Sequence, residues 1–290
     1  MLRGVCTFVC DDCGHRFKGM DCEWMATAYT TPVRCPKCNS MHTYPSSYNI
    51  AFPLGGLFGL KKTFYRKIWK SIDERNKTDK ELMNSNIFFQ PFVGKDYANG
   101  GIFGKRIMIL GESHYCEEEC ADCGDCRLHR ECMDFTQHVL DDYLNENKER
   151  QNWMRTFLKF ERSLVGEETN QAMRLKIWNS VVFFNYLQVA MGGPREAGTA
   201  EQYQQAGKEF FEVIEKYQPE YIIVWGKRLW NNLPNVRWQD SDDIVVDGYP
   251  VATGAYLLSN GKQVKVMAVN HPSVGYSWDY WYRVIQRFLE

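Results

Sequence analysis

Eleven cysteines, none of them beyond Cys132, constrain this chain more than any other feature. Four of them form two C-x2-C pairs, Cys10–Cys13 and Cys35–Cys38. Each pair can place two thiolates on one ion, and two pairs complete a tetrahedral zinc site. The spacing predicts a small zinc ribbon over residues 1–44. A segment of this length buries little core, so metal binding would supply much of its folding free energy.

A second group of cysteines lies in a predicted insertion over residues 116–132. Its members are Cys116, Cys120, Cys123, Cys126 and Cys132. Their close spacing predicts a second metal site, held by four cysteines or by three cysteines and His129. Compact C-x2-C-x2-C spacing is also typical of iron–sulfur ligation. Zinc and a 4Fe-4S cluster therefore both remain open for this site.

The composition limits the class of protein. With 44% hydrophobic and 14% aromatic residues, the chain can bury a sizeable core. A formal net charge of −1 argues against nucleic-acid binding through bulk charge and leaves only local basic patches. The sequence has no charged-plus-apolar leader and no apolar run near the roughly 18 residues of a membrane span. We expect a cytoplasmic protein without membrane contact, whose clustered cysteines bind metal rather than form disulfides.

Residues 45–89 are predicted to be a linker followed by a basic helix. The first part is rich in Pro, Gly and Ser, and residues 61–80 carry an excess of Lys and Arg. Phe64, Ile68 and Ile72 recur at helical spacing, so one face should pack inward. The basic face is interpreted either as a solvated surface or as a surface that contacts phosphates.

The remaining chain alternates between strand-like and helical patterns. Apolar runs at 106–110, 177–185, 221–226 and 264–269 predict buried strands, and Asn260-Gly261 predicts a hairpin before the last of them. Helical patterns cover 131–145, 150–165, 200–217 and 278–289. This alternation predicts an α/β fold: a three-layer α/β/α sandwich with a mostly parallel central sheet, in addition to the N-terminal zinc ribbon.

Polar residues follow three of these strands, where ligands bind in open α/β sheets. They are Glu112, Ser113, His114 and Tyr115 after a turn at Gly111, Asn185 after the second strand, and Asn270, His271 and Ser273 after the last. An Asn amide matches the donor–acceptor edge of a pyrimidine. A His can stabilise an oxyanion. The Glu-Ser-His group is suited to hold or activate a water molecule, and Tyr115 can wall a flat pocket.

Residues 90–290 resemble the uracil-DNA glycosylase superfamily. Gly111-Glu-Ser-His-Tyr115 is similar to its first motif and Asn270-His-Pro-Ser273 to its second, which contributes Asn270 and Ser273 to base binding. Val181–Asn185 is similar to the strand that carries the base-reading Asn, and Val224-Trp-Gly226 to a Trp-Gly strand end. The resemblance implies that Asn185 reads the base and Phe135 stacks on it. His271 would stabilise the departing base, a water near Glu112 and Ser113 would attack the sugar, and Tyr115 would contact the 5-position of the base.

The sequence departs from this family at two places. Ser113 stands where the most active relatives carry an Asp, and the residues after Ser273 lack the Pro-Leu-Ser wedge. We therefore expect a DNA glycosylase acting on uracil or on a modified pyrimidine, in single-stranded DNA or modified phage DNA among other substrates. The alternative is a non-catalytic nucleic-acid-binding protein of the same fold. A small-molecule hydrolase is a third hypothesis, although the sequence has no G-x-S-x-G elbow and no phosphate-binding Gly-rich loop.

Overall fold

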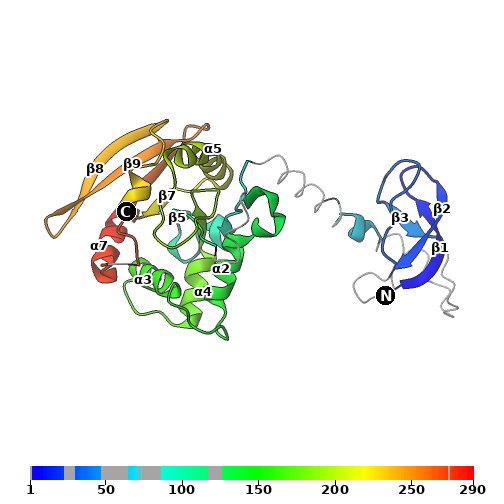
Figure 1. The fold of residues 1–290 in the computed structure, drawn as a ribbon, viewed down its shortest axis with the longest axis horizontal. Helices are drawn as coiled ribbons and strands as arrows, with labels where there is room; N and C mark the ends of the chain where they lie inside the picture. Colours follow the sequence, from blue (N-terminus) through cyan, green and yellow to red (C-terminus); the bar gives the residue numbers. More distant parts are fainter. Residues whose placement is uncertain are drawn as a thin grey trace. The chain divides into compact units, whose positions relative to one another are not determined.

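The structure, a computed structural model, describes residues 2–22, 30–46, 65–70, 73, 86–116, 126–273 and 275–290. The chain divides into two compact units, Met1–Ser85 and Asn86–Glu290 (Figure 1). Most of the predicted linker and basic helix lies outside the described residues, as do Cys120 and Cys123. Among the described residues, no helix combines the length and apolar character needed to cross a membrane.

The N-terminal unit is built on a three-stranded antiparallel sheet of order β2-β1-β3. Its strands are β1 (Leu2–Cys10), β2 (Arg16–Cys22) and β3 (Thr43–Pro45). Residues 65–70 are helical, as the sequence predicts, and Tyr65, Ile68 and Trp69 bury their side chains together with Tyr44 of β3. The Tyr65 hydroxyl donates to the Thr30 carbonyl oxygen at 3.0 Å, so this helical segment belongs to the core of the unit.

The C-terminal unit contains a seven-stranded sheet of order β4-β6-β5-β7-β10-β9-β8. Its strands are β4 (Phe92–Val93), β5 (Ile107–Gly111), β6 (Val181–Asn185), β7 (Tyr221–Trp225), β8 (Trp238–Val246), β9 (Tyr249–Leu257) and β10 (Gln263–Val269). The four strands β6, β5, β7 and β10 are parallel, and β4, β9 and β8 are antiparallel to their neighbours. The predicted α/β class is confirmed, but the sheet is mixed rather than mostly parallel. Tight turns at Asp247-Gly248 and Asn260-Gly261, all but Asn260 with positive φ, return the chain antiparallel.

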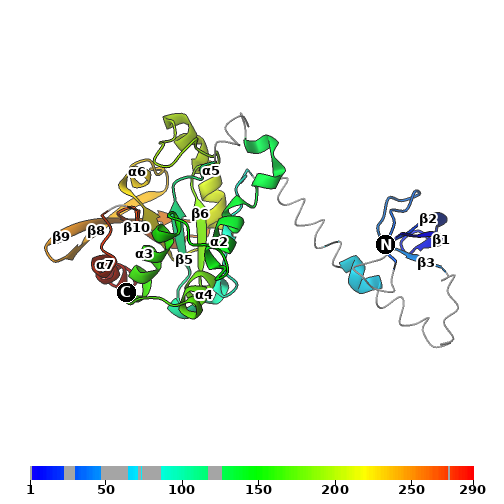
Figure 2. The same cartoon turned by 60° about the horizontal axis from the view of Figure 1, so that its bottom comes forward.

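Strand side chains alternate between two buried clusters, one on each face of the sheet. Ile107 and Ile109 join the cluster that includes α3 (Met154–Val165), α4 (Gln171–Asn179) and α7 (Trp278–Leu289). Met108 and Leu110 join the cluster formed with α5 (Ala200–Tyr217) and α6 (Lys227–Trp230). Helix α2 (Phe135–Leu144) packs with the first cluster, and α3 lies beside α7 (Figure 2). In the described part of this unit, the short 3-10 helices are Tyr97–Asn99, Gly101–Phe103, Cys126–Leu128 and Arg130–Cys132.

The predicted strand 177–185 is wrong in its first half. Residues 177–179 end helix α4, and the strand begins only at Val181. The Asn170 side chain caps this helix by accepting from the Met173 backbone N–H at 2.9 Å. Ile177 and Trp178 are fully buried, so the end of a buried helix and the start of a buried strand read as one apolar run.

Candidate functional site

The four ribbon cysteines converge as predicted. The Sγ atoms of Cys10, Cys13, Cys35 and Cys38 all lie within 4.8 Å of one another. Two of the separations are 3.5 Å, Cys10 to Cys38, and 3.7 Å, Cys13 to Cys35. Zn–S bonds of about 2.3 Å in a tetrahedron place sulfurs about 3.8 Å apart, so the arrangement is compatible with zinc or another metal of that geometry.

Two tight turns hold these thiols. The Gly14 backbone N–H donates to the Cys10 carbonyl, and the Asn39 N–H donates to the Cys35 carbonyl. Gly14 and Asn39 both adopt left-handed backbone conformations, which Gly and Asn tolerate best. Burial raises the pKa of Cys35, but N–H groups of Cys38 and Lys37 and the neighbouring thiols outweigh it and lower the pKa to about 7. The favoured thiolate is that of Cys35, because burial raises the pKa of Cys10, and at Cys38 the Ser40 N–H lowers the pKa but the neighbouring thiols raise it to about 12.

The second cysteine group is described only in part. Cys116, Cys126 and Cys132 are half-buried. The Ala190 N–H donates to the Cys126 Sγ at 3.4 Å, and the Cys116 N–H donates to the Met191 carbonyl. His129 contacts Glu131, with 3.4 Å between Nδ1 and Oε1. The second metal site therefore stays a prediction, because Cys120 and Cys123 lie outside the described residues.

The carboxyl ends of β5 and β6 lie side by side. Gly111 pairs with Asn185 in the parallel ladder. The two chains remain hydrogen-bonded beyond this pair, because the Tyr186 and Leu187 N–H groups donate to the carbonyls of Gly111 and Glu112. A Cβ at position 111 would stand 2.1 Å from the Asn185 Oδ1. Gly111 is thus still within the strand, and its absent side chain leaves room for the Asn185 amide rather than making a turn.

Buried Asn185 and half-buried Phe135 both contact the ring of buried His114. The Asn185 Nδ2 lies 3.1 Å from the His114 Nδ1, and the His114 Nε2 lies 2.9 Å from the Thr136 Oγ1. The His114 and Phe135 ring centroids are 4.5 Å apart. Burial lowers the pKa of His114 to about 3, so the imidazole is neutral at physiological pH. The predicted base-reading and base-stacking residues are therefore neighbours of the same ring.

Glu112 is held by a cation. The Arg228 guanidinium donates to both carboxylate oxygens, Nε to Oε1 at 2.7 Å and Nη2 to Oε2 at 2.6 Å. The Tyr203 hydroxyl donates to the same Oε1. Only 12% of the Glu112 side chain is exposed, against 42% for Arg228. A carboxylate held in this way is poorly placed to take a proton from water, so the predicted water-activating role gains no support from this geometry.

His271 lies near this ion pair with one nitrogen free. Its Nδ1 accepts from the Ser273 backbone N–H at 3.3 Å and lies 2.8 Å from the Ser273 Oγ. The accepting Nδ1 places the proton on Nε2, which no residue in the described part of the chain hydrogen-bonds. Surrounding protein lowers the pKa of His271, while the charge of Glu112 raises it and that of Arg228 lowers it. The result is a neutral imidazole with an N–H available to an anion.

The other predicted residues lie around this edge. Tyr115 is 41% exposed and pairs through its backbone with Met191. Asn270 and Ser273 are exposed in the turn after β10, and Ser113 is half-buried beside His114. Trp225, at the end of β7, directs its ring at His271 with 6.1 Å between centroids and 81° between planes. The first and second motifs thus meet the same sheet edge.

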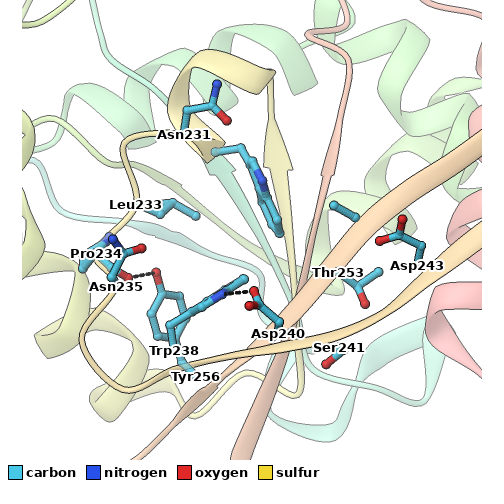
Figure 3. Close-up of a pocket in the computed structure, with 12 residues that line it drawn as sticks. Asn231, Leu233, Pro234, Asn235, Trp238, Asp240, Ser241, Asp243, Thr253 and Tyr256 are labelled. Carbon is cyan, nitrogen blue, oxygen red and sulfur yellow. Dashed lines mark hydrogen bonds between the residues drawn. The ribbon is translucent and has the colours of Figure 1, made fainter.

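A separate hollow of about 350 Å³ lies among α6, β8 and β9 (Figure 3). Trp238 borders it and donates from its indole N–H to Asp240 at 2.8 Å, and the Tyr256 hydroxyl donates to the Pro234 carbonyl. None of the predicted site residues lines it. Its carboxylates Asp240 and Asp243 do not suit a phosphate, so this hollow gives no support to the predicted nucleic-acid site.

Sequence reasoning missed the partners of the predicted residues. Arg228 follows the Trp-Gly strand end by only two positions, a signal that was available in the sequence. Thr136 is next to Phe135, and Tyr203 belongs to the apolar face of α5, where its hydroxyl gives no separate pattern. Residue type and spacing do not predict which buried hydroxyl will hydrogen-bond a side chain at a particular strand end.

No protein-family model matches this chain, and neither does any curated protein. The resemblance of the strand-end motifs to uracil-DNA glycosylases accordingly stays a hypothesis, and support for a function has to come from the geometry of the site.

Proposed function

We propose that residues 90–290 form a DNA glycosylase of the uracil-DNA glycosylase type, which hydrolyses the N-glycosidic bond of uracil or a modified pyrimidine flipped from DNA. The observation that carries the proposal is that Asn185, with Phe135 beside it through His114, and the His271 turn lie at the carboxyl edge of the same parallel strands, β6-β5-β7-β10. Helices on both faces of that sheet agree with a three-layer α/β/α sandwich.

Each residue has a chemical role in this proposal. The Asn185 amide reads the pyrimidine edge, and Phe135 stacks on the ring. As the glycosidic bond breaks, negative charge develops on the base, and the His271 Nε2–H donates to it. A neutral imidazole is suitable because it can stabilise the negative charge through a hydrogen bond without transferring its proton to the base. Ser273 keeps that proton on Nε2 by donating its backbone N–H to Nδ1.

Cations at the rim favour a nucleic-acid substrate. Arg195, in the segment after β6, and Lys227, just after β7, are both exposed. The Arg228 guanidinium donates a hydrogen bond to the Arg195 carbonyl at 3.0 Å. Such local charge supplies phosphate contacts in a chain with little net charge. The proposal includes zinc in the ribbon, zinc or a 4Fe-4S cluster in the second cysteine group, and a cytoplasmic location in which the thiols stay reduced.

The test is a base-release assay. Purified protein is incubated with labelled DNA carrying uracil or one of a panel of modified pyrimidines, in single and double strands, and abasic sites are cleaved with alkali. We expect an alkali-labile product that is lost in Asn185→Ala. In His271→Ala the rate should fall by about 100- to 1000-fold, with DNA binding largely retained. His138→Ala, an exposed histidine of α2, is the matched control. Equal rates for His271→Ala and the parent protein would refute the role of His271.

One observation favours the non-catalytic alternative. Glu112 is the carboxylate nearest the motif, and Arg228 engages both of its oxygens. A protein without a free carboxylate at this position would bind nucleic acid in a base-selective manner without releasing a base. In that case the panel gives no product, and Asn185→Ala weakens binding to one base without changing any rate.

A further inference from the structure

The side chain of His114 fills the centre of the candidate base site. Only 4% of it is exposed. The Asn185 Nδ2 lies 3.1 Å from the His114 Nδ1 and 3.2 Å from the His114 Nε2, and the same Nε2 lies 2.9 Å from the Thr136 Oγ1. Because the amide nitrogen is almost equally far from both ring nitrogens, it lies over the face of the imidazole. The ring is therefore held by polar contacts with Asn185 and Thr136 in addition to packing.

Aromatic rings enclose the imidazole on two sides. The Phe135 ring lies 4.5 Å away with 44° between planes, and the Phe89 ring lies 4.9 Å away with 69°. The Phe89 segment is itself anchored, because the Gln188 Oε1 accepts from the backbone N–H groups of Phe88 and Phe89 at 2.8 and 2.9 Å. Gln188 in turn donates to the Asn185 carbonyl at 3.0 Å. The walls of the slot are thus tied to the strand end that carries Asn185.

These contacts are the ones a flipped pyrimidine would need. A carbonyl of the base would accept from the Asn185 Nδ2, which now contacts both nitrogens of the imidazole, and the ring of the base would pack against Phe135. We propose that His114 is a built-in ligand of the base slot, which occupies it until an incoming pyrimidine displaces the imidazole. This inference rests on the proposed function, since it uses the same slot, and it adds how access to that slot is controlled.

Displacement has to come from the side chain. The His114 carbonyl accepts from the Met191 N–H at 2.8 Å, and the Cys116 N–H donates to the Met191 carbonyl at 3.1 Å. On the other side of His114, the Glu112 carbonyl accepts from the Leu187 N–H at 2.9 Å. Because the backbone is paired on both sides of His114, the ring leaves by rotation about its side-chain bonds. The apparent association constant for a base is then the intrinsic constant multiplied by the fraction of molecules whose slot is open.

The experiment measures binding of free bases to the full chain, without DNA and without catalysis. Calorimetry or ligand-observed NMR compares uracil and imidazole as probes, with the parent protein, His114→Ala and the control His138→Ala. Removing the ring leaves an aromatic-lined cavity of a kind that takes up small flat molecules. We expect His114→Ala to bind both probes, with affinity for uracil at least about tenfold above that of the parent. The control should match the parent.

A folded His114→Ala protein that binds neither probe, or imidazole alone, would overturn the inference, because His114 would then be a core side chain and not the occupant of a base slot. Thr136→Val provides a second variant of similar volume, which removes the Nε2 partner but keeps the ring. It should also raise uracil affinity, and an unchanged affinity counts against the inference. Uracil binding by His114→Ala combined with no base release from DNA would retain the inference and remove the glycosylase proposal.

Discussion

The protonation of His271 depends on burial and on two opposite charges beside it. Desolvation lowers the pKa of the imidazole most, the charge of Glu112 raises it, and that of Arg228 lowers it. Because Arg228 binds Glu112 through two hydrogen bonds, its charge largely cancels the carboxylate. Arg228 therefore helps keep His271 neutral, without a hydrogen bond to it.

Replacing Arg228 should raise the pKa of His271. Arg228→Gln removes the positive charge and leaves the Glu112 carboxylate uncompensated, and both changes favour the imidazolium. The shift can be followed in an NMR pH titration of the His271 ring proton. Arg283→Gln, which breaks an exposed pair with Asp247, should leave that titration unchanged. A pKa of His271 that stays constant or falls in Arg228→Gln would contradict this account.

Buried His114 should make the C-terminal unit less stable in acid. Its pKa is about 3 in the folded chain and near 6.5 when unfolded, so between these values the unfolded state binds the proton and the folded state does not. Stability from this group is therefore full above pH 6.5 and declines as the pH falls toward 3. In His114→Asn this decline should be absent, as measured by denaturant unfolding at successive pH values. A parallel decline in parent and variant would contradict the prediction.

Residue identity could be predicted at this edge, but side-chain direction could not. The motifs place His114 between Ser113 and Tyr115 at a strand end, where a water-holding role is reasonable from chemistry alone. In the structure the ring turns inward to Thr136 and Asn185, which are distant in the sequence. Such a choice depends on packing among several elements, and no local pattern encodes it.

Three helices of the C-terminal unit share one buried carboxylate. Glu161 of α3 is fully buried and accepts from Tyr143 of α2 at 2.7 Å and from Trp178 of α4 at 3.1 Å. Arg174 of α4 completes an ion pair with it at 3.1 Å. Arg174, Tyr143 and Trp178 all donate to the Glu161 carboxylate. Loss of Glu161 would therefore leave a buried guanidinium, a buried hydroxyl and a buried indole N–H without this partner.

Glu161→Ala should destabilise the C-terminal unit by about 3–5 kcal/mol, the usual cost of breaking a buried ion pair from one side. Glu168→Ala is the matched control, because Glu168 also pairs with an arginine, Arg162, but is 80% exposed. That variant should stay within about 0.5 kcal/mol of the parent. Urea unfolding monitored by tryptophan fluorescence measures both. Similar losses in the two variants would show that the Glu161 group is not what joins these helices.

Elements with strong periodicity were predictable, and elements with exposed faces were not. The predicted helix at 200–217 coincides with α5, whose start is fixed by a capping box of Thr199 and Gln202. Strand β8 escaped prediction because most of its residues are exposed, including Asp240, Asp242 and Asp243. Strand β8 is stabilised by its hydrogen-bonded pairing with β9, which its own sequence pattern does not indicate.

At the scale of the whole chain, two units obtain their stability in different ways. The C-terminal unit buries two aromatic-rich clusters on the two faces of its sheet. In its described residues, the N-terminal unit has a three-stranded sheet, one small buried cluster and the four converged cysteines. We expect a unit of this kind to need a metal ion at the cysteines for folding.

Cys35→Ser should consequently unfold the N-terminal unit and leave the C-terminal unit intact. Cys35 is almost fully buried among the four thiols, so a serine there removes one of the four expected metal ligands. We expect one equivalent of metal fewer per chain by elemental analysis, fast hydrogen exchange over residues 2–46, and unchanged exchange in β5, β6 and β7. Cys22→Ser is the matched control, because Cys22 lies outside the four-thiol group. Slow exchange in both units of Cys35→Ser would mean that strand pairing and the Tyr65–Trp69 cluster hold the N-terminal unit without the ion, and that the cysteines serve another purpose than folding.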